Sequence, residues 1–388
     1  MKTLGIIAEY NPFHLGHRYH LTEAIRQSGA DAAVIIMSGS FVQRGEPAMC
    51  SKWARAKMAL LGGADLVIEL PVIYSAQSAE YFAAGAVRLL NELGTDFISF
   101  GTESDSLNSI MSAAKLAAEE PPEYRTALAD ALSTGVSFPT ARERAASACG
   151  VDGILNTPNN ILAVEYLKAM IKTDSKMQPI PILRHGSQHG GTGSASYIRG
   201  LGVEAAAEHM PESSLAVFRE EVKNGRAPVT PDCMDAAVIS RLRLMSAAEL
   251  AEIADVSEGL ENRIKEGAAR CCAVNTAADY IKTKRYTHAR IRRIMFNAML
   301  GIQQRHVTSQ PEYIRVLGMN KIGAAVLKQA KHACALSIIT KTAAAPDCVK
   351  ASPGFGFDLK ATDVYSLAFP DPTQRVGGLD YTTSPVHI

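Results

Sequence analysis

Histidine residues recur at short spacing just after the first apolar run of the chain. His14 and His17 lie either side of Gly16 in a His-x-Gly-His pattern, and His20 follows. Pro12 fixes the loop before them, and the pattern predicts a helix that begins near Gly16. The first turn of a helix has unpaired N–H groups and a partial positive charge, which suit a phosphate group. Because imidazole N–H groups can donate to phosphate oxygens as negative charge develops there, we interpret this segment as phosphate-binding.

Packing and metal binding are the alternative interpretations of these histidines. His14 and His17 would supply only two ligands to a metal ion, and no cluster of Cys or Glu nearby completes a tetrahedral set. A lone histidine is more often a packing or surface residue. The spacing just after a predicted buried strand favours phosphate contact over both alternatives, so no metal-binding residue is predicted.

Five short apolar runs are typical of buried strands and alternate with longer helical patterns. The runs lie at 4–8, 33–37, 66–70, 97–100 and 180–183, and the first helical patterns at 17–28, 51–62 and 75–93. Strands separated by helix-length connections predict a parallel α/β sheet. Such a sheet binds its ligand at the carboxyl ends of the strands, so the residues just after each run matter most.

The rest of the chain has mostly helical patterns. The segment at about 105–172 is expected to be a helical insertion in a catalytic domain at 1–202. No strand is expected after residue 202, and an all-helical domain is predicted at 203–342, with helices at 214–224, 233–255, 260–270, 287–302 and 321–336. The tail at 343–388 is rich in Pro, Gly, Thr and Asp and is expected to be irregular.

Composition excludes several classes of protein. The chain has 388 residues, of which 47% are hydrophobic, with 40 Lys+Arg against 39 Asp+Glu. This apolar content excludes a disordered chain, and the balance of charge gives no overall field that would attract nucleic acid or a membrane. The seven cysteines form no CxxC pair, and no apolar stretch is long enough for a signal-peptide core or a membrane span. We expect a cytoplasmic protein with reduced cysteines and no membrane partner.

Six motifs, in this order, resemble those of one protein family. They are EYNPFHLGH at 9–17, SGSFVQRGEP at 38–47, DLVIELP at 65–71, FGTE at 100–103, PNNI at 158–161 and KRYT at 284–287. The first motif resembles that of the nucleotidyltransferase superfamily named for its HIGH-type motif. The set as a whole resembles the bacterial tRNA(Met) cytidine acetate ligase family, over residues 5 to about 300.

The resemblance implies a Rossmann-like parallel sheet of the HIGH-motif type and a two-step reaction. Members of the family activate acetate with ATP to acetyl-adenylate, releasing pyrophosphate. They then pass the acetyl group to N4 of the wobble cytidine of elongator tRNA(Met). The implied substrates are therefore acetate, ATP with Mg²⁺, and elongator tRNA(Met), and no stable protein partner is expected.

The resemblance also implies which residues form the site. His14, His17 and Arg199 are the expected catalytic residues, with Arg199 neutralising the leaving pyrophosphate from a serine-rich turn whose alternative role is to cap a helix. The expected ATP-binding residues are Ile7, Ala8, Glu9, Tyr10, Asn11, Pro12, Phe13, His14, Leu15, Gly16, His17, Arg18, Tyr19, His20, Gly101, Asn159, Asn160, Arg184, His185, Ser194 and Ser196. Gly101 and Arg184 directly follow predicted strands, so both should face one cleft. The stretch at 188–191 departs from the Tyr-His-Asp-like sequence of the family, which leaves His189 without an assigned role.

A basic window breaks the overall charge balance. Residues 280–311 contain seven Lys or Arg and no Asp or Glu. A solvated basic face is the alternative interpretation, but the missing acids and the need to hold a tRNA favour contact with the phosphate backbone. With a second basic cluster after the second strand, the expected tRNA-binding residues are Arg44, Lys52, Arg55, Lys282, Lys284, Arg285, Arg290 and Arg293.

Two other functions are weighed against an acetate ligase. A small-molecule adenylyltransferase that makes a dinucleotide would not need the basic window or the long helical region. A non-catalytic, ATP-sensing RNA-binding module would not need an intact set of His14, Gly16, His17 and Arg199. Candidates for an acetate pocket are Asn11, Ser38 and the loop at 39–45.

Overall fold

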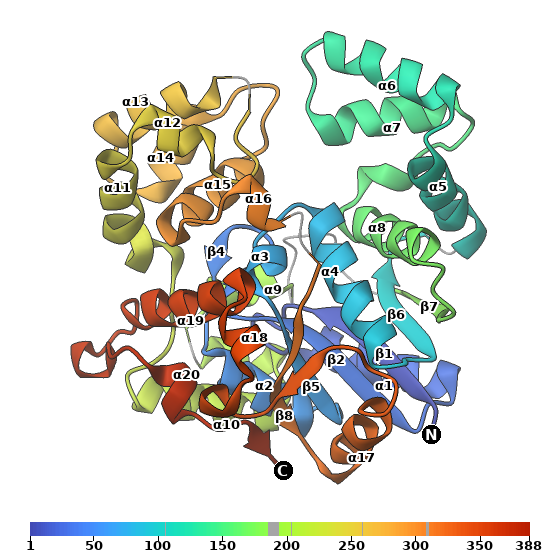
Figure 1. Cartoon of the computed structure of the whole chain (residues 1–388), viewed down its shortest axis with the longest axis vertical. Coiled ribbons are helices and arrows are strands. Elements are labelled where there is room, and N and C mark those ends of the chain that lie inside the picture. Colours follow the sequence, from blue (N-terminus) through green and yellow to red (C-terminus); the bar gives the residue numbers. More distant parts are fainter. Residues whose placement is uncertain (105, 185–193, 203, 258, 308–309) are drawn as a thin grey trace.

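A mostly parallel sheet forms the centre of the computed structural model, which describes residues 1–388 except 105, 185–193, 203, 258 and 308–309. Its parallel strands run in the spatial order β5-β2-β1-β6-β7: β1 (Thr3–Ala8), β2 (Ala32–Ser38), β5 (Leu66–Leu70), β6 (Phe97–Thr102) and β7 (Gln178–Leu183). All five apolar runs therefore form strands, and the predicted α/β fold is confirmed (Figure 1).

Helices cover both faces of this sheet, which is why its strands are continuous apolar runs. Ile35 of β2 belongs to a core shared with one helix layer: α1 (Leu15–Ser28), α2 (Lys52–Leu61) and α10 (Glu212–Lys223). The next residue, Ile36, belongs to the core of the opposite layer: α3 (Val72–Ser75), α4 (Ala79–Glu92) and α8 (Pro158–Lys172). Each strand is thus fixed from two sides, and its carboxyl end is held in a rigid frame.

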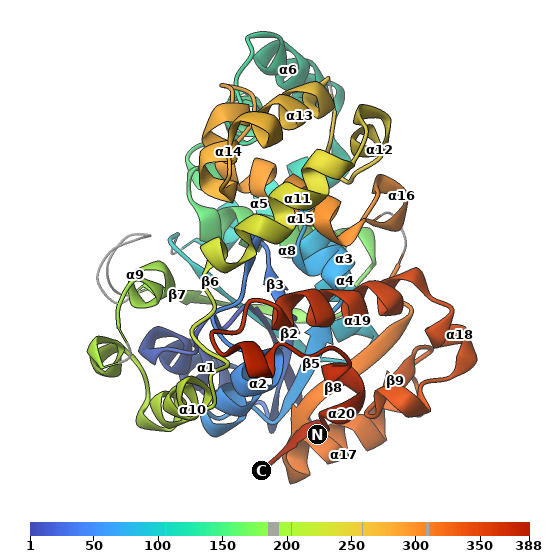
Figure 2. The ribbon, with the colours of Figure 1, turned by 90° about the vertical axis from the view of Figure 1, so that its left-hand side faces the viewer.

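Two groups of helices extend beyond one edge of the sheet. The insertion lies between β6 and β7 and contains α5 (Leu107–Glu119), α6 (Pro122–Ser133), α7 (Phe138–Ala148) and η1 (Ile154–Asn156) before α8. The second group, here called the helical lobe, spans residues 235–300: α11 (Asp235–Leu244), α12 (Ala247–Ala251), α13 (Leu260–Arg270), α14 (Val274–Ile281) and α15 (His288–Leu300). Figures 1 and 2 show both groups at the top of the molecule, on the same side of the sheet.

Short elements link these parts. A small hairpin of β3 (Phe41–Val42) and β4 (Glu46–Pro47) follows β2. The remaining connecting elements are α9 (Ala195–Arg199), η2 (Ala205–His209), η3 (Pro231–Met234) and α16 (Gln304–Val307).

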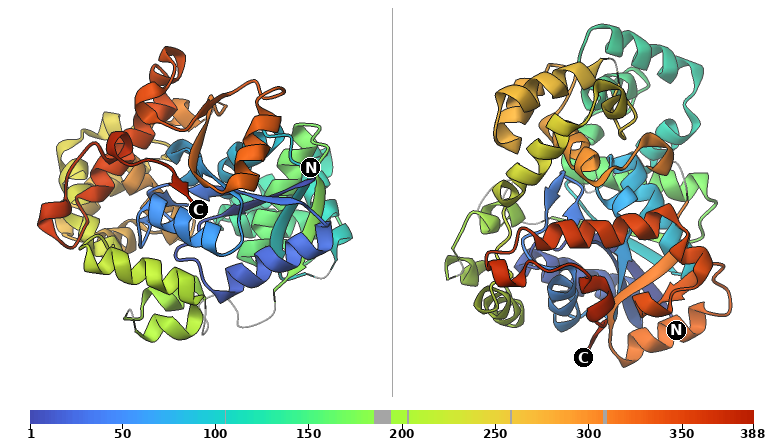
Figure 3. Two further views of the ribbon diagram at one scale, coloured as in Figure 1. Left: turned by 90° about the horizontal axis from the view of Figure 1, so that it is seen from below. Right: turned by 60° about the vertical axis from the view of Figure 1, so that its left-hand side comes forward.

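The C-terminal part contradicts the expectation that no strand follows residue 202. β8 (Tyr313–Met319) joins the sheet antiparallel to β5, and both β9 (Ser337–Ile339) and β10 (Val386–His387) pair with β8. The first helix after β8, α17 (Lys321–Ala330), lies within the helix predicted at 321–336, and η4 (Thr342–Ala344) follows it. The prediction of an irregular tail at 343–388 was wrong, because that segment contains α18 (Asp347–Lys350), α19 (Pro353–Ser366), η5 (Pro372–Gln374) and α20 (Leu379–Thr382). The chain thus returns to the sheet on which it began (Figure 3).

A buried arginine explains why β8 did not resemble a strand. Arg315 lies in the middle of β8 with 4% of its surface exposed. Its guanidinium Nη2 donates to Asp380 Oδ1 at 2.6 Å, and Nε lies 3.4 Å from Glu69 Oε2. These carboxylates lie far from Arg315 in the sequence, so the residue that breaks the apolar run is neutralised by partners that local pattern does not reveal.

The same carboxylates correct the prediction that Lys52 contacts RNA. The Lys52 side chain is fully buried, and Nζ lies 2.9 Å from Glu69 Oε1 and 2.8 Å from Asp380 Oδ1. Lys52 and Arg315 together therefore balance Glu69 and Asp380, and the four residues tie α2, β5, β8 and α20 together. Lys52 is a structural cation with no surface to offer to a nucleic acid.

Substituting Lys52 should destabilise the protein strongly. Lys52→Ala leaves two buried carboxylates with one cation, and breaking a buried ion pair in this way costs about 3–5 kcal/mol. Lys57→Ala is the matched control on the same helix, because its pair with Glu220 is solvent-exposed and contributes less than about 1 kcal/mol. Urea unfolding of both variants measures the difference, and equally small losses would contradict the structural role of Lys52.

Candidate active site

The histidines of the first loop cap the helix that follows them. His14 precedes α1, and its Nδ1 accepts a hydrogen bond from the Gly16 N–H at 3.1 Å. The His14 N–H in turn donates to His17 Nδ1 at 3.3 Å, and the two rings stack with centroids 3.7 Å apart. Because each Nδ1 accepts a hydrogen bond, the ring proton of each neutral histidine lies on Nε2. Both rings therefore keep an Nε2–H donor close to the start of α1.

Burial keeps these histidines uncharged near neutral pH. Burial, together with the nearby cations Arg184 and Arg199, lowers the pKa of His14 to about 4. Burial also lowers the pKa of His17 well below its usual value and that of His20 to about 4. His20 is further fixed by a 3.0 Å hydrogen bond between its Nε2 and Ser99 Oγ of β6. The loop thus presents neutral hydrogen-bond donors rather than a cluster of positive charges.

Arg55 anchors this loop and was wrongly expected to contact RNA. Its side chain is completely buried, and its Nη1 donates to the carbonyls of Glu9 at 2.7 Å and Ser38 at 2.9 Å. Further hydrogen bonds run from Nε to the Cys50 carbonyl at 3.1 Å and from Nη2 to the Gly39 carbonyl. One guanidinium therefore joins the ends of β1 and β2, and it has no exposed surface for a phosphate backbone.

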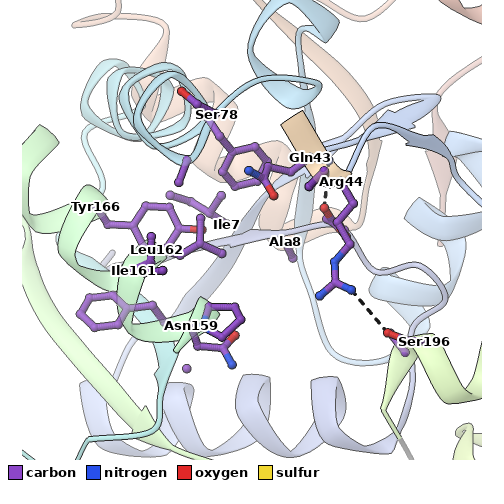
Figure 4. Close-up of a pocket in the computed structure, with 18 of the residues that line it drawn as sticks. Ile7, Ala8, Gln43, Arg44, Ser78, Asn159, Ile161, Leu162, Tyr166 and Ser196 are labelled. Atoms are coloured by element: carbon purple, nitrogen blue, oxygen red, sulfur yellow. Dashed lines mark hydrogen bonds between the residues drawn. The ribbon is translucent and has the colours of Figure 1, made fainter. Parts of the chain in front are cut away.

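A cavity of about 1150 Å³ opens at the carboxyl ends of the strands. Side chains from the sheet, the insertion and the helical lobe line it together, and Figure 4 shows Arg44 extending across it toward Ser196. Among the described residues, its lining includes eight arginines, no lysine and three acidic residues, Glu9, Glu80 and Asp255; the arginines are Arg44, Arg142, Arg184, Arg199, Arg285, Arg290, Arg292 and Arg293. The cavity is therefore suited to a large anionic ligand.

Most residues expected to bind ATP line this one cavity. They are Ile7, Ala8, Glu9, Tyr10, His14, Gly16, His17, Tyr19, His20, Gly101, Asn159, Arg184, Ser194 and Ser196, together with Arg199. The strand order explains the convergence, since β1 lies between β2 and β6 and the chain changes direction across the sheet at that point.

Six of the expected ATP-binding side chains do not line the cavity: Asn11, Pro12, Phe13, Leu15, Arg18 and Asn160. Asn11 Oδ1 accepts a hydrogen bond from the Met49 N–H at 2.7 Å, so this side chain is used inside the fold. Asn160 is buried, and its Oδ1 accepts from Thr102 Oγ1 and the Glu103 N–H, which fixes the end of β6. His185 and His189 lie outside the described residues.

The serine-rich turn has two separate roles. Ser194 caps α9, because its Oγ accepts a hydrogen bond from the Tyr197 N–H at 3.2 Å. Ser196 Oγ instead lies 3.5 Å from Arg44 Nη1. Arg199 is held at the cavity wall, where it donates to Glu46 Oε1 and to the Asn11 carbonyl, both at 2.9 Å. Glu46 belongs to the motif at 38–47, but no role in the site was predicted for it from the sequence.

The helical lobe closes the far side of the cavity with arginines. Arg290 Nε lies 3.2 Å from Asp255 Oδ1, and Arg293 Nη2 lies 3.4 Å from Asp255 Oδ2. The lobe touches the β3–β4 hairpin directly: Gly45 has a φ of 70°, and a Cβ built there would lie 2.4 Å from the Arg293 main-chain nitrogen. Lys282 and Lys284 are exposed and lie outside the cavity lining.

Several lining residues had no signal in the sequence. Arg142 and Tyr166 of the insertion and Asp255 of the lobe belong to no motif, and only the fold brings them to the cavity. Arg292 lies in the acid-free window, so charge pattern could have identified it.

A metal-binding cluster and a membrane-spanning helix are both absent from the described ranges. No group of three or more His, Cys, Asp or Glu residues there is arranged to hold a metal ion. No helix in that part of the chain has the length and apolar character required to cross a membrane.

Known proteins are similar to this chain in sequence over nearly its whole length. A model of the HIGH nucleotidyl transferase family matches residues 1–378. The protein named tRNA(Met) cytidine acetate ligase from Syntrophomonas wolfei is 39% identical, over 100% of this chain and 99% of that protein. The protein of the same name from Caldanaerobacter subterraneus is 42% identical, over 95% of this chain and 96% of that protein.

Solved structures extend the similarity to three dimensions. The crystal structure of Thermotoga maritima TmcAL bound with alpha-thio ATP has a TM-score of 0.93 and 35% identity, and covers 100% of this chain and 99% of that chain. The apo form of the same protein has a TM-score of 0.94 and 34% identity, with complete coverage of both chains. The chain therefore belongs to the tRNA(Met) cytidine acetate ligase family of HIGH nucleotidyl transferases.

Proposed function

We propose that this protein uses ATP to convert acetate to acetyl-adenylate and then transfers the acetyl group to N4 of the wobble cytidine of elongator tRNA(Met). The observation that carries the proposal is one cavity that combines neutral histidine donors at a helix start with arginines from several distant parts of the chain. The names of the relatives and the ATP analogue bound to the Thermotoga maritima protein support the same reaction.

The first step needs no covalent bond to the protein. An acetate oxygen forms a bond to the α-phosphorus of ATP, and the bond to the leaving pyrophosphate breaks. The Nε2–H groups of His14 and His17 would donate to the phosphate oxygens, and the start of α1 adds main-chain N–H groups. Arg184 and Arg199 would neutralise charge on pyrophosphate. Positioning and charge stabilisation then lower the barrier.

ATP would span the switch point of the sheet between β1 and β6. Gly101 lies at the cavity end of β6, and Asn159 lies in the first turn of α8, with its side-chain amide donating to Glu103. Mg²⁺ would enter with ATP, because this ion is usually held by phosphate oxygens and water with few protein carboxylates. The lack of a preformed ligand cluster among the described residues is compatible with such binding.

The second step requires the tRNA to reach the same cavity. A wobble base lies in a loop, so turning it into a pocket does not require opening a duplex. The arginines of the helical lobe line the side of the cavity opposite the first loop, and Lys282 and Lys284 lie exposed just before α15. We infer that the lobe contacts the tRNA backbone. A small-molecule adenylyltransferase would not need the basic residues of the helical lobe.

The reaction can be tested with purified protein, ATP, radiolabelled acetate and elongator tRNA(Met). We expect N4-acetylcytidine after nuclease digestion and, without tRNA, acetate-dependent exchange of pyrophosphate into ATP. Transfer of AMP to a small metabolite, with no acetylcytidine, would instead support the adenylyltransferase and contradict the proposal.

His17 should matter for the first step alone. His17→Ala removes a neutral donor from the first loop and should slow acetate-dependent pyrophosphate exchange by about 100-fold or more, the usual effect of losing one such donor. The affinity for tRNA should stay within about twofold, because the pKa of His17 is lowered well below its usual value, so the side chain carries no charge that could pair with a backbone phosphate near neutral pH. Pyrophosphate exchange at the wild-type rate in His17→Ala would exclude a role for His17 in the first step.

Lys282 and Lys284 should contribute to tRNA affinity without affecting activation of acetate. If both contact phosphates, Lys282→Ala with Lys284→Ala should reduce the slope of log K against log salt by about 2. Lys328→Ala with Lys331→Ala is the matched control, because these exposed lysines lie on and just after α17 at the opposite end of the molecule (Figure 1). Equal slopes in both double variants would exclude this surface.

A further inference from the structure

Glu9 lies at the centre of the site but has no part in the first step as described. It directly follows β1, the strand next to the switch point of the sheet, and it precedes the loop that ends in His14. Its side chain lines the cavity. Figure 4 shows the preceding residues Ile7 and Ala8 on the same wall, with Arg44 reaching across beside them. The Glu9 carboxylate therefore lies in the same cavity as His14 and His17.

The other acidic side chains of the cavity are held by cations. Glu80 Oε1 lies 2.7 Å from Lys168 Nζ, and Asp255 binds both Arg290 and Arg293. Glu9 makes no ion pair with any described residue. Its Oε1 accepts a hydrogen bond from the Gln43 main-chain N–H at 3.0 Å, and this is the only hydrogen bond of the Glu9 side chain within the described part of the chain. One oxygen is therefore fixed, and the other remains available to a ligand.

The nearby histidines and tyrosines are poor proton acceptors. His14 and His17 each use Nδ1 to accept a main-chain N–H and carry their proton on Nε2, so neither has a free lone pair. Burial raises the pKa of both Tyr10 and Tyr166, which keeps their hydroxyls protonated. Among the described residues of this wall, Glu9 is the group with a free basic atom.

Proton transfer is needed in the second step of the proposed function. The N4 amine of cytidine forms a bond to the acetyl carbonyl carbon, and the bond between that carbon and the phosphate oxygen breaks. AMP leaves with the electron pair, and one N4 proton must be removed. We propose that Glu9 is the general base that accepts this proton on its free carboxylate oxygen and later releases it to water. This inference rests on the proposed function.

The surroundings of Glu9 suit this role. Burial raises its pKa above the usual value of a glutamic acid, which makes it a better proton acceptor. The charged and titratable groups around it are Arg44 and Glu46 of the hairpin, Arg199 of α9, Arg55 of α2 and Tyr166 of α8. Burial, the largest effect, and Glu46 raise the pKa of Glu9, whereas Arg44 and Arg199 lower it, and the net shift is upward.

The test separates the two half-reactions in the full-length protein. Glu9→Gln keeps the shape of the side chain and cannot accept a proton. Because Glu9 also lines the cavity expected to hold ATP, acetate-dependent pyrophosphate exchange should fall by about tenfold at most, whereas single-turnover transfer from preformed acetyl-adenylate to tRNA should fall by about 100-fold or more. A structural role, or a role in holding Mg²⁺ with ATP, would slow exchange as much as transfer, and that result would overturn the proposal.

The pH profile of the transfer step gives a second readout. In the wild type the rate should rise with pH as Glu9 loses its proton and then level off, whereas Glu9→Gln should lack this rise. Glu9→Asp should retain the rise at a lower rate, and Glu80→Gln, which removes a different carboxylate from the cavity, should retain it fully. Persistence of the rise in Glu9→Gln would place the base elsewhere and overturn the proposal.

This inference and the proposed function fail in different ways. If the wild type exchanges pyrophosphate but never acetylates tRNA, the proposed function is wrong and the role of Glu9 falls with it. If the wild type acetylates tRNA and Glu9→Gln does so equally well, only the role of Glu9 is wrong.

Discussion

The buried guanidinium of Arg55 holds together the strand ends from which the site is built. Main-chain carbonyls lose their ladder partners where parallel strands diverge into loops, and leaving such groups buried without a donor is costly. Arg55 donates to the carbonyls of Glu9, Ser38, Gly39 and Cys50 at once. The first loop and the turn after β2 therefore share one anchor, which fixes the His14 cap on one side and the β3–β4 hairpin on the other.

The β3–β4 hairpin, which follows the anchored end of β2, packs directly against the helical lobe. Gly45 lies so close to the main chain of Arg292 and Arg293 that no side chain fits between them. Arg44 and Glu46, on either side of Gly45, reach Ser196 and Arg199 of the serine-rich turn. Three segments distant in the sequence thus meet around one cavity. A single cavity suits a reaction in which the product of the first step is a reactive mixed anhydride, because the second substrate can reach it before water does.

The sequence was most informative where the signal is local. The apolar runs and the order of motifs predicted the parallel strands. They also predicted that His14, Gly101 and Arg184 lie at one edge of the sheet. The errors came from charged residues whose partners are distant. Lys52 and Arg55 resembled RNA contacts because the sequence does not show whether a basic residue is buried. For the same reason, the charged Arg315 made the β8 segment look unlike a buried strand. Which imidazole nitrogen carries the proton depends on two hydrogen bonds of the folded loop, which no pattern of residue types reveals.

The central claim is that an acetate oxygen attacks the α-phosphate of ATP within this cavity. The most direct measurement uses acetate labelled with ¹⁸O at both oxygens, together with ATP and elongator tRNA(Met), and mass spectrometry of the nucleotide product. The account predicts AMP that carries one ¹⁸O atom for each acetylcytidine formed, because the bond between the acetyl carbon and the bridging oxygen breaks in the second step. Unlabelled AMP, or ADP as the product, would contradict it.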